Sequence, residues 1–271
     1  MPQDLPVAKR PDGGVSRQFP TSRAVVALIL REMATRYGRS PGGYIWALLE
    51  PMGAIGVMAF GFSLLINNPP LGNSFILFFA TGFLVFGVYQ DLSLAVSRSI
   101  QFSRPLLFYP TVTWVDAVVA RLVLNTLTSI LVILLLMTTL VLVTDARIVL
   151  DMSAVVEAVG LAILFGTSVG MVNCVLLGLF PIWGQIWSIA TRPLFIISGV
   201  FFLYEGLPTL AQNILWYNPL MHITGLMRKG FYSTYSADYV SIPFVAGVSV
   251  ALLFLGVVTM GRFHRDILND G

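Results

Sequence analysis

"LILREMATRYGRSPGGYIWALLEPMGAIG" (residues 28–56) changes character twice along its length. Around its start, residues 22–37 place Val26, Ile29, Leu30, Met33 and Tyr37 on one helical face and the charged side chains elsewhere. That pattern is typical of a basic amphipathic helix lying on the inner leaflet of a membrane. Glycines and a proline then break the helix, and an apolar run begins that carries a glutamate. We therefore expect a helix along the membrane surface, a turn, and a helix that enters the hydrocarbon.

The composition excludes an ordinary soluble domain. The 271 residues are 56% hydrophobic and 11% charged, with a mean hydropathy of +0.84. Soluble domains carry about 25% charged residues, so this chain is expected to be an integral membrane protein. The net charge of +3 is attributed to basic residues that set membrane topology, and we expect no nucleic-acid partner. The single cysteine excludes an internal disulfide and a cysteine-rich metal site.

Apolar segments long enough to cross the hydrocarbon, which takes about 20 helical residues, recur along the chain. They predict an all-α integral membrane protein with a transmembrane domain over residues 22–261 and a cytoplasmic C-terminus over 262–271. Residues 1–21 lack the apolar core of a signal peptide and are expected to form a disordered cytoplasmic tail. The expected spans are about 44–66, 75–96, 114–143, 153–179, 184–204 and 241–261.

The distribution of basic residues predicts the orientation. With the N-terminus inside, Arg147, Arg228 and Lys229 are the basic residues of the outer loops, and Arg192 falls inside a span. Both ends of the chain are therefore expected in the cytoplasm. The inner stretches hold Lys9, Arg10, Arg17, Arg23, Arg31, Arg36, Arg39, Arg98, Arg104, Arg121, Arg262 and Arg265.

The loops between the expected spans differ in length and polarity. Residues 67–74 and 144–151 are short outer turns, whereas 97–113 is a longer inner loop. The outer segment 205–240 is too polar to span the membrane and too apolar for a free loop. Two short helices that lie at the outer face or dip into it fit this segment best.

Small residues recur every four positions in the fourth expected span. Such a row allows helix backbones to approach closely, although a strict four-residue row drifts around a straight helix and only part of it can share one contact. Gly166 and Gly170 form the centre of the row. We interpret Cys174 as a small packing residue rather than a reactive thiol. The row consists of Ala154, Ala158, Ala162, Gly166, Gly170, Cys174 and Gly178.

No catalytic constellation occurs in the sequence. His222 and His264 lie on opposite sides of the membrane in the expected topology and cannot share a metal. A P-loop needs a lysine directly after a glycine, but Lys9 follows an alanine and Lys229 follows an arginine. We therefore expect no cofactor and no ATPase activity in this chain, and any ATPase that drives it must be another polypeptide.

Glu50, Asp91 and Arg192 fall within expected spans. Such residues usually face a bundle interior, a partner or a watery path. Counted at 1.5 Å per residue, Glu50 lies about 9 Å and Arg192 about 12 Å from the inner face. Two interpretations stay open. The two residues form a structural ion pair, or they line an inner gate where Arg192 meets a lipid phosphate.

Three segments resemble a known family. The segments "LREMATRYGRSPGGYIWALLEP" (30–51), "VDAVVARLVLNT" (115–126) and "WYNPLMHITGLMRKGFY" (216–232) look like those of ABC-2 type export permeases, specifically the capsular polysaccharide exporters (KpsM-like). The resemblance covers about residues 22–261 with the same six-span layout. It implies the ABC-2 (type V exporter) fold, in which 22–37 is an interface helix, 97–112 a coupling helix, and 205–240 holds periplasmic re-entrant helices.

The resemblance also implies partners. The permease would act as a homodimer with two copies of a nucleotide-binding ATPase subunit that binds ATP and Mg²⁺. It would move a lipid-linked polysaccharide across the bacterial inner membrane to a periplasmic co-polymerase-type adaptor and an outer-membrane export protein. The residues expected to contact the ATPase are Arg31, Arg36, Arg98, Phe102, Arg104, Phe108 and Tyr109.

Aromatic side chains offer a physical reason for a sugar polymer, because sugar C–H faces stack on rings through contacts that can slide. The alternative is an aromatic belt facing lipid, for which Trp183 and Trp187 are the strongest candidates. The residues expected along the substrate channel are Tyr44, Trp46, Glu50, Tyr89, Arg192, Phe201, Phe202, Tyr204, Trp216 and Tyr217.

Other functions remain as alternatives. The same fold exports other lipid-linked polymers, such as O-antigen or teichoic acid. A membrane-embedded transferase would need carboxylates or histidines converging at one membrane face, and the sequence lacks such a cluster. A secondary transporter would place paired ionisable groups at the midplane, whereas Glu50 and Asp91 lie nearer the inner face.

Overall fold

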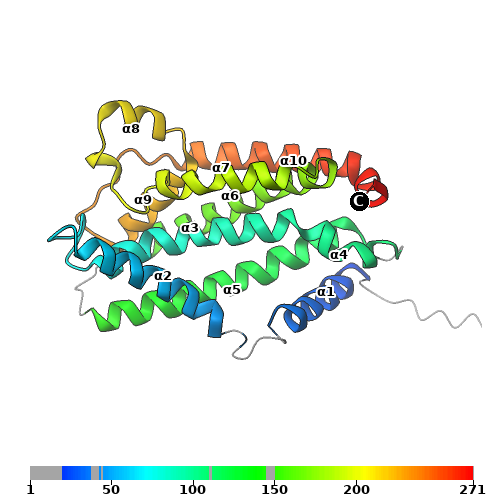
Figure 1. Cartoon of the computed structure of the whole chain (residues 1–271), viewed down its shortest axis with the longest axis horizontal. Coiled ribbons are helices and arrows are strands. Elements are labelled where there is room, and N and C mark those ends of the chain that lie inside the picture. The colour runs from blue at the N-terminus through cyan, green and yellow to red at the C-terminus, as the bar shows by residue number, and fades with distance from the viewer. Residues whose placement is uncertain (1–19, 38–42, 44, 110–111, 145–149, 271) are drawn as a thin grey trace, which may run out of the picture.

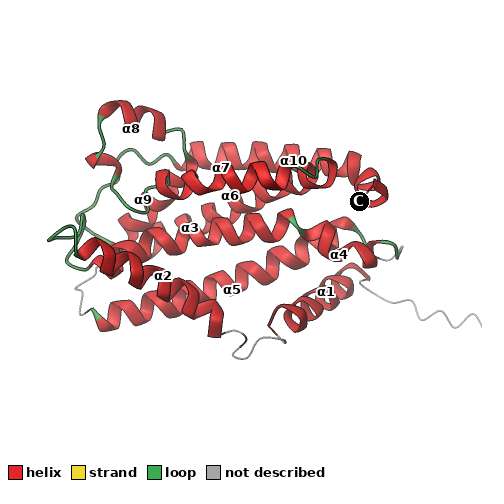
Figure 2. Ribbon diagram, in the orientation of Figure 1, coloured by secondary structure: helices red, strands yellow, loops and turns green. Residues whose placement is uncertain are grey.

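The chain, seen in a computed structural model, is described over residues 20–37, 43, 45–109, 112–144 and 150–270. Residues 1–19 of the expected tail (1–21) and Tyr44 lie outside these residues, whereas residues 20 and 21 belong to the first helix. The described residues form helices joined by loops, with no strand among them (Figure 2). The helices are α1 (Pro20–Tyr37), α2 (Ile45–Ser63), α3 (Phe75–Ser97), α4 (Ser99–Leu107), α5 (Trp114–Val143), α6 (Met152–Leu179), α7 (Trp183–Ile197), η1 (Tyr204–Gly206), α8 (Thr209–Leu215), α9 (Pro219–Phe231) and α10 (Ile242–Asp270).

Helices long and apolar enough to cross a membrane match five of the expected spans. They are Ile45–Ser63, Phe75–Leu107, Trp114–Val143, Met152–Leu179 and Ile242–Leu268. The first of them follows α1, so the two helices expected from residues 28–56 are present, and residues 38–42 of the expected turn lie outside the described residues.

The expected span at 184–204 differs from the other five. Its helix, α7, has 15 residues and ends at Ile197. At 1.5 Å per residue it is about 22 Å long, short of the roughly 30 Å hydrocarbon core. Gly199 follows with φ +76°, a left-handed conformation that side chains with a Cβ rarely adopt. By length alone, the described residues therefore support five spans and leave the sixth unconfirmed.

The core lies between α3 and α6. Two thirds (67%) of the most apolar window of each of these spans is buried, against 11% for α2, 22% for α5 and 17% for α10. A Cβ at Gly170 would lie 2.8 Å from the Val96 Cβ and 2.9 Å from the Ser93 carbonyl oxygen. Only glycine fits there, so the small-residue row allows α6 to pack closely on α3 within one chain. Cys174 is buried beside Ser99, as expected of a packing residue.

The expected outer segment contains two short helices with opposite environments. α8 has no buried residue, whereas α9 is buried over nearly its whole length and packs against α6 and α3. Gly230 permits this approach, because a Cβ there would lie 2.5 Å from a Val155 methyl group. α9 is therefore an inserted element of the bundle and not a surface helix.

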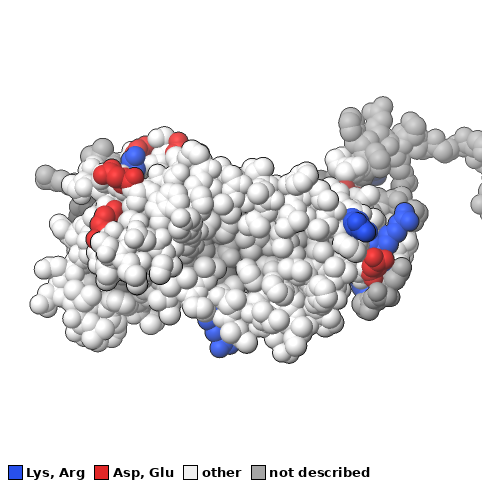
Figure 3. Space-filling model, turned by 90° about the horizontal axis from the view of Figure 1, so that it is seen from above, with Lys and Arg blue, Asp and Glu red and all other residues white. Residues whose placement is uncertain are grey.

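The two ends of the bundle carry different elements (Figure 1). α1, α4 and the C-terminal end of α10 gather at one end, and α8 and α9 lie towards the other. On the face drawn in Figure 3, mostly acidic side chains lie at the α8 end, mostly basic ones at the opposite end, and the surface between them is largely uncharged. An uncharged band between two charged ends is the pattern expected of a chain that crosses a membrane.

Candidate functional site

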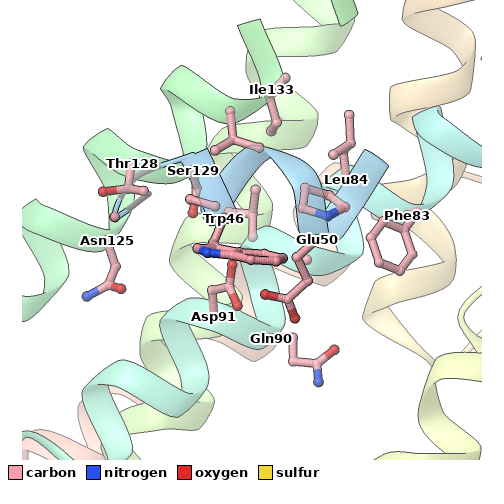
Figure 4. A pocket seen from close by; sticks show the side chains of 16 residues that line it. Trp46, Glu50, Phe83, Leu84, Gln90, Asp91, Asn125, Thr128, Ser129 and Ile133 are labelled. Atoms are coloured by element: carbon pink, nitrogen blue, oxygen red, sulfur yellow. The ribbon is translucent and has the colours of Figure 1, made fainter. Parts of the chain in front are cut away.

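A cavity of about 390 Å³ opens between α2, α3 and α5 (Figure 4). Each of the three helices places lining residues four positions apart, so these residues share one face of their helix and point into the same space. Trp46 and Glu50 are four residues apart on α2, as are Gly87 and Asp91 on α3 and Asn125 and Ser129 on α5. The full lining is Gly43, Trp46, Ala47, Glu50, Pro51, Phe83, Leu84, Gly87, Val88, Gln90, Asp91, Asn125, Thr128, Ser129, Val132 and Ile133.

Two carboxylates share this cavity. Figure 4 shows Glu50 and Asp91 on the same side of the Trp46 ring. Both side chains are exposed in the chain, as is the neighbouring Gln90. Pro51, which also lines the cavity, has no N–H to donate to the Ala47 carbonyl four residues earlier. The cavity therefore contains several hydrogen-bond acceptors, and α2 contributes some of them although this helix is otherwise apolar.

The charged residues of the expected spans do not form the expected pair of Glu50 and Arg192. Among the described residues Glu50 and Arg192 form no ion pair, and Arg192 is exposed on α7 away from the cavity lining. Asp91 is the charged residue that shares the cavity with Glu50. One of the two interpretations left open by the sequence was a structural ion pair between Glu50 and Arg192. This pair does not form within one chain.

An ion pair missed in the sequence holds α1 on the bundle. Glu32 Oε2 lies 3.2 Å from Arg121 Nε, and both side chains are buried. Arg121 also donates to the Ala95 carbonyl oxygen at 2.9 Å and lies over the Phe102 ring at 4.2 Å. The pair explains part of the "VDAVVARLVLNT" segment: Asp116 caps α5, Arg121 pairs with α1, and Asn125 reaches the cavity.

α1 has two adjacent stripes. The stripe that faces the bundle includes the buried residues Leu28 and Glu32, and the exposed stripe carries Val26, Leu30 and Met33. Residues Arg98, Thr35 and Asp91 line a second cavity of about 280 Å³ beside the Glu32–Arg121 pair. The exposed apolar stripe is suited to lipid, which agrees with an amphipathic helix that packs on the bundle by its other side.

The residues expected to contact an ATPase separate into covered and exposed groups. Phe102 is covered by Arg121 and by Arg31, whose guanidinium lies 5.1 Å from the ring centre. Arg104 donates to the Leu268 carbonyl oxygen of α10 at 2.8 Å. The exposed group is Arg98, Phe108 and Tyr109, and the side chain of Arg36 lies outside the described residues.

The expected channel residues are scattered over the fold. Tyr89 is buried against Phe165, and Phe201 packs in an aromatic cluster with Phe62, Phe79 and Phe195. Trp46 and Glu50 line the cavity between α2, α3 and α5. The other described members of the set lie outside the cavity. Tyr204 stacks on Tyr239, Trp216 donates to the Tyr239 carbonyl oxygen, Phe202 is half-buried, and Tyr217 and Arg192 are exposed.

The end of the bundle that carries α8 and α9 contains a buried arginine, Arg228, which the sequence pattern assigns to a loop. Arg228 donates from Nη1 to the Phe202 carbonyl oxygen and from Nη2 to the Val200 carbonyl oxygen, both at 2.9 Å. Its guanidinium lies 4.2 Å from the centre of the Phe78 ring. Arg228 therefore ties α9 to α3 and to the segment after α7. The signal was its helical spacing from Met221 and Thr224, seven and four residues earlier.

His222 is equally enclosed. Its Nδ1 accepts from the Ser241 backbone N–H at 3.1 Å, so Nε2 carries the hydrogen and donates to the Trp216 carbonyl oxygen at 2.6 Å. Nearby, Asp151 caps α6, and the Ser153 hydroxyl that donates to it lowers the pKa of that carboxyl. At this end of the molecule, Arg228, His222 and Asp151 each have hydrogen-bond partners.

Comparison with known proteins agrees with this architecture. The sequence model of the ABC-2 type transporter family matches residues 23–232. The chain is 28% identical to the capsule polysaccharide export inner-membrane protein BexB of Haemophilus influenzae over 245 residues, which covers 90% of this chain and 92% of BexB. It is 28% identical to the polysialic acid transport protein KpsM of Escherichia coli over 86% of this chain and 90% of KpsM. It is 26% identical to the capsule polysaccharide export inner-membrane protein CtrC of Neisseria meningitidis over 90% of this chain and 92% of CtrC. The chain belongs to the ABC-2 type transporter family.

Proposed function

We propose that this chain is the permease subunit of an ATP-binding cassette exporter that moves a lipid-linked capsular polysaccharide across the bacterial inner membrane. The observation that carries the proposal is the similarity to three capsule or polysialic acid export proteins over 86–90% of the chain. Helices suited to cross a membrane and a polar cavity between three of them support it.

The topology in this proposal has six spans and both termini in the cytoplasm. α7 and the residues that follow it form the fifth span, and α9 is a re-entrant helix inserted from the periplasm. The basic residues around α1 and α4 support a cytoplasmic position for that end, because inner loops carry the excess of lysine and arginine. The cavity then lies on the cytoplasmic side of the bundle, where a lipid-linked glycan is made available.

The working unit in this proposal is a homodimer. α7 has no buried residue and yet carries Arg192, a charge that is costly to place against lipid. A second copy packed along α7 would shelter this charge beside a central path. The small-residue row of α6 is already used within one chain, so the argument for a dimer rests on α7.

Energy in this proposal comes from two copies of a separate ATPase that bind ATP and Mg²⁺. The exposed residues Arg98, Phe108 and Tyr109 at the ends of α4 are its first contacts. Because Phe102 and Arg104 are held inside the chain, they transmit movement of α4 to α1 and α10. A periplasmic adaptor and an outer-membrane export protein would receive the glycan.

The test is deletion of this chain in its native host. We expect surface glycan to disappear and lipid-linked glycan to accumulate in the cytoplasm, and the chemistry of the accumulated glycan identifies a capsule, an O-antigen or a teichoic acid. Native mass spectrometry of the purified complex should show two copies of this chain with two copies of an ATPase. Undiminished surface glycan after deletion would contradict the export function, and an active complex with one copy would contradict the dimer.

A further inference from the structure

The helix α7 carries three exposed polar side chains along one line of its surface. Gln185, Ser188 and Arg192 are separated by three and four residues, so they lie on the same face of the helix. All three are exposed in the chain, and Arg192 is the one charged residue of α7. We call these three residues the polar stripe of α7. At 1.5 Å per residue, the stripe extends for about 10 Å along the helix.

A different face of α7 packs on the bundle. Trp183 donates from Nε1 to Oδ1 of Asn173 on α6 at 2.9 Å. The Phe195 ring lies 5.1 Å from the Phe86 ring of α3, measured between ring centres. The polar stripe therefore takes no part in anchoring α7 within the chain. The half-buried residues of the anchoring face are Trp183, Trp187, Thr191, Leu194 and Phe195.

The third face of α7 is exposed and apolar, which suits lipid or the second copy of the proposed homodimer. With about 100° between successive helical residues, the polar stripe falls between this apolar face and the anchoring face. Two of the three faces of α7 are thus suited to apolar neighbours, and the polar stripe is not. The exposed apolar residues are Ile186, Ile189, Ala190, Pro193, Ile196 and Ile197.

The chemistry of the polar stripe indicates what lies beside it. A guanidinium placed against hydrocarbon is costly, and such residues face a bundle interior or a watery path. Pro193 adds polarity next to Arg192, because it has no N–H to donate to the Ile189 carbonyl oxygen. Gln185 and Ser188 both donate and accept, whereas Arg192 donates only and keeps its positive charge. Since a guanidinium binds a carboxylate or a phosphate through two parallel hydrogen bonds, the matching neighbour is an anion flanked by hydroxyl groups.

We propose that the polar stripe of α7 binds anionic groups of the exported glycan, with Arg192 as the residue that recognises a carboxylate or a phosphate. Gln185 and Ser188 exchange hydrogen bonds with hydroxyl groups beside the anion, and the exposed apolar face packs against the second copy. The inference rests on the proposed export function and on the homodimer. It adds the chemical class of the substrate: a polymer that is acidic in its lipid linkage or in its sugar units.

The charge preference of a thiol on the polar stripe tests the proposal in the absence of glycan. Ser188→Cys places a thiol about one helical turn from Arg192, in a chain whose one natural cysteine, Cys174, is replaced by alanine. Ala190→Cys, on the exposed apolar face at nearly the same depth, is the control. The measurement uses permeabilised membranes from a strain that cannot begin glycan synthesis, so that reagents reach both membrane faces.

The measured quantity is the ratio of two labelling rates, that of the anionic sulfonatoethyl methanethiosulfonate over that of the cationic trimethylammonioethyl methanethiosulfonate. Any change in the ionisation of the thiol alters both rates alike and cancels in the ratio. Because a positive charge attracts the anionic reagent, we expect a ratio several-fold higher at residue 188 than at residue 190. Arg192→Gln should remove this difference, and Arg192→Lys, which keeps the charge, should retain it.

Three strains then identify the anion, again in permeabilised membranes and without ATP. One strain makes the full lipid-linked glycan, one makes only its lipid-linked starter, and one cannot begin synthesis. If the anionic reagent labels Ser188→Cys several-fold more slowly in the first two strains, the stripe binds the phosphate of the lipid linkage. Slower labelling in the first strain alone assigns the stripe to acidic sugar units. Ala190→Cys should be labelled at the same rate in all three strains.

Three results would overturn the proposal. The first is a thiol at residue 188 that neither reagent labels, or one with no more preference for the anionic reagent than residue 190, as expected if Arg192 faces lipid or pairs with a carboxylate of the second copy. The second is a preference that survives Arg192→Gln. The third is equal labelling of Ser188→Cys in all three strains. Surface glycan is measured alongside, so equal labelling with intact export refutes the anion site and leaves the export function standing.

Discussion

Two regions of this molecule hold their polar side chains in opposite ways. At the end that carries α8 and α9, Arg228 and His222 are enclosed: Arg228 donates to two backbone carbonyl oxygens, and His222 donates to one carbonyl oxygen and accepts from one backbone N–H. The side chains of Glu50 and Asp91, which line the cavity between α2, α3 and α5, are exposed. Enclosed polar groups with hydrogen-bond partners hold the elements of the fold together, whereas carboxylates on the wall of a cavity in a membrane segment mark a functional path.

The largest expected effect on the fold is at Arg228. Arg228→Ala removes the donors of the Val200 and Phe202 carbonyl oxygens, and each buried acceptor without a partner costs about 1–3 kcal/mol. We expect little folded protein by fluorescence-detected size-exclusion chromatography. Lys229→Met, at the exposed neighbouring position, should leave the folded yield unchanged. A normal melting temperature for Arg228→Ala would show that the end of the bundle that carries α9 is not held by this residue.

The second prediction concerns the pair that holds α1. Glu32→Gln removes one charge of a buried ion pair, which typically costs about 3–5 kcal/mol. We expect a clear fall in melting temperature and partial recovery when Arg121→Met is added, because both charges of the pair are then gone. Arg23→Gln, on an exposed position of the same helix, is the control. If the double variant is less stable than Glu32→Gln alone, the contact of Arg121 with Phe102 matters more than the pair.

The sequence predicted the elements of the fold better than the partners of its charges. α1 and five spans follow from composition and periodicity, and Gly166 and Gly170 indicated the close packing of α6. The helix α7 was predicted too long because residues 198–204 are apolar, and composition does not distinguish a helix from a buried non-helical run. Gly199 was the available signal for the break.

For the candidate site too, the sequence predicted the charged residues better than it predicted their partners. Glu50 and Asp91 were recognised as intramembrane charges, and the cavity contains them both. Arg192 was placed at the depth of Glu50 by residue counting, which gives depth along a helix but not the direction in which a side chain points. Glu32 and Arg121 lie far apart in the sequence, and no local pattern joins them. Their proximity is a consequence of tertiary packing.

The third prediction tests the close packing of α6 on α3 with a matched pair of glycines. Gly170→Ala places a methyl group 2.8 Å from the Val96 Cβ and should destabilise the chain by about 1–3 kcal/mol. At Gly160 on the same helix, no atom lies within 4 Å of an added Cβ. Gly160→Ala should be neutral or slightly stabilising, because alanine favours a helix by about 1 kcal/mol over glycine. Equal melting temperatures for the two variants would contradict the packing.

The smallest expected effect on the fold, and the largest on function, is at the cavity. Glu50 has no ion pair among the described residues, so Glu50→Gln should change stability by no more than about 0.5 kcal/mol. Asp91→Asn keeps the shape of its side chain and should also fold normally. Because both carboxylates line the polar cavity of the proposed permease, we expect surface glycan to fall in each variant and further in the double variant. Glu157→Gln, an exposed carboxylate on α6 outside the cavity, should change neither. A drop in melting temperature for Glu50→Gln as large as that for Glu32→Gln would make Glu50 a structural residue and remove the contrast between the cavity and the end that carries α8 and α9.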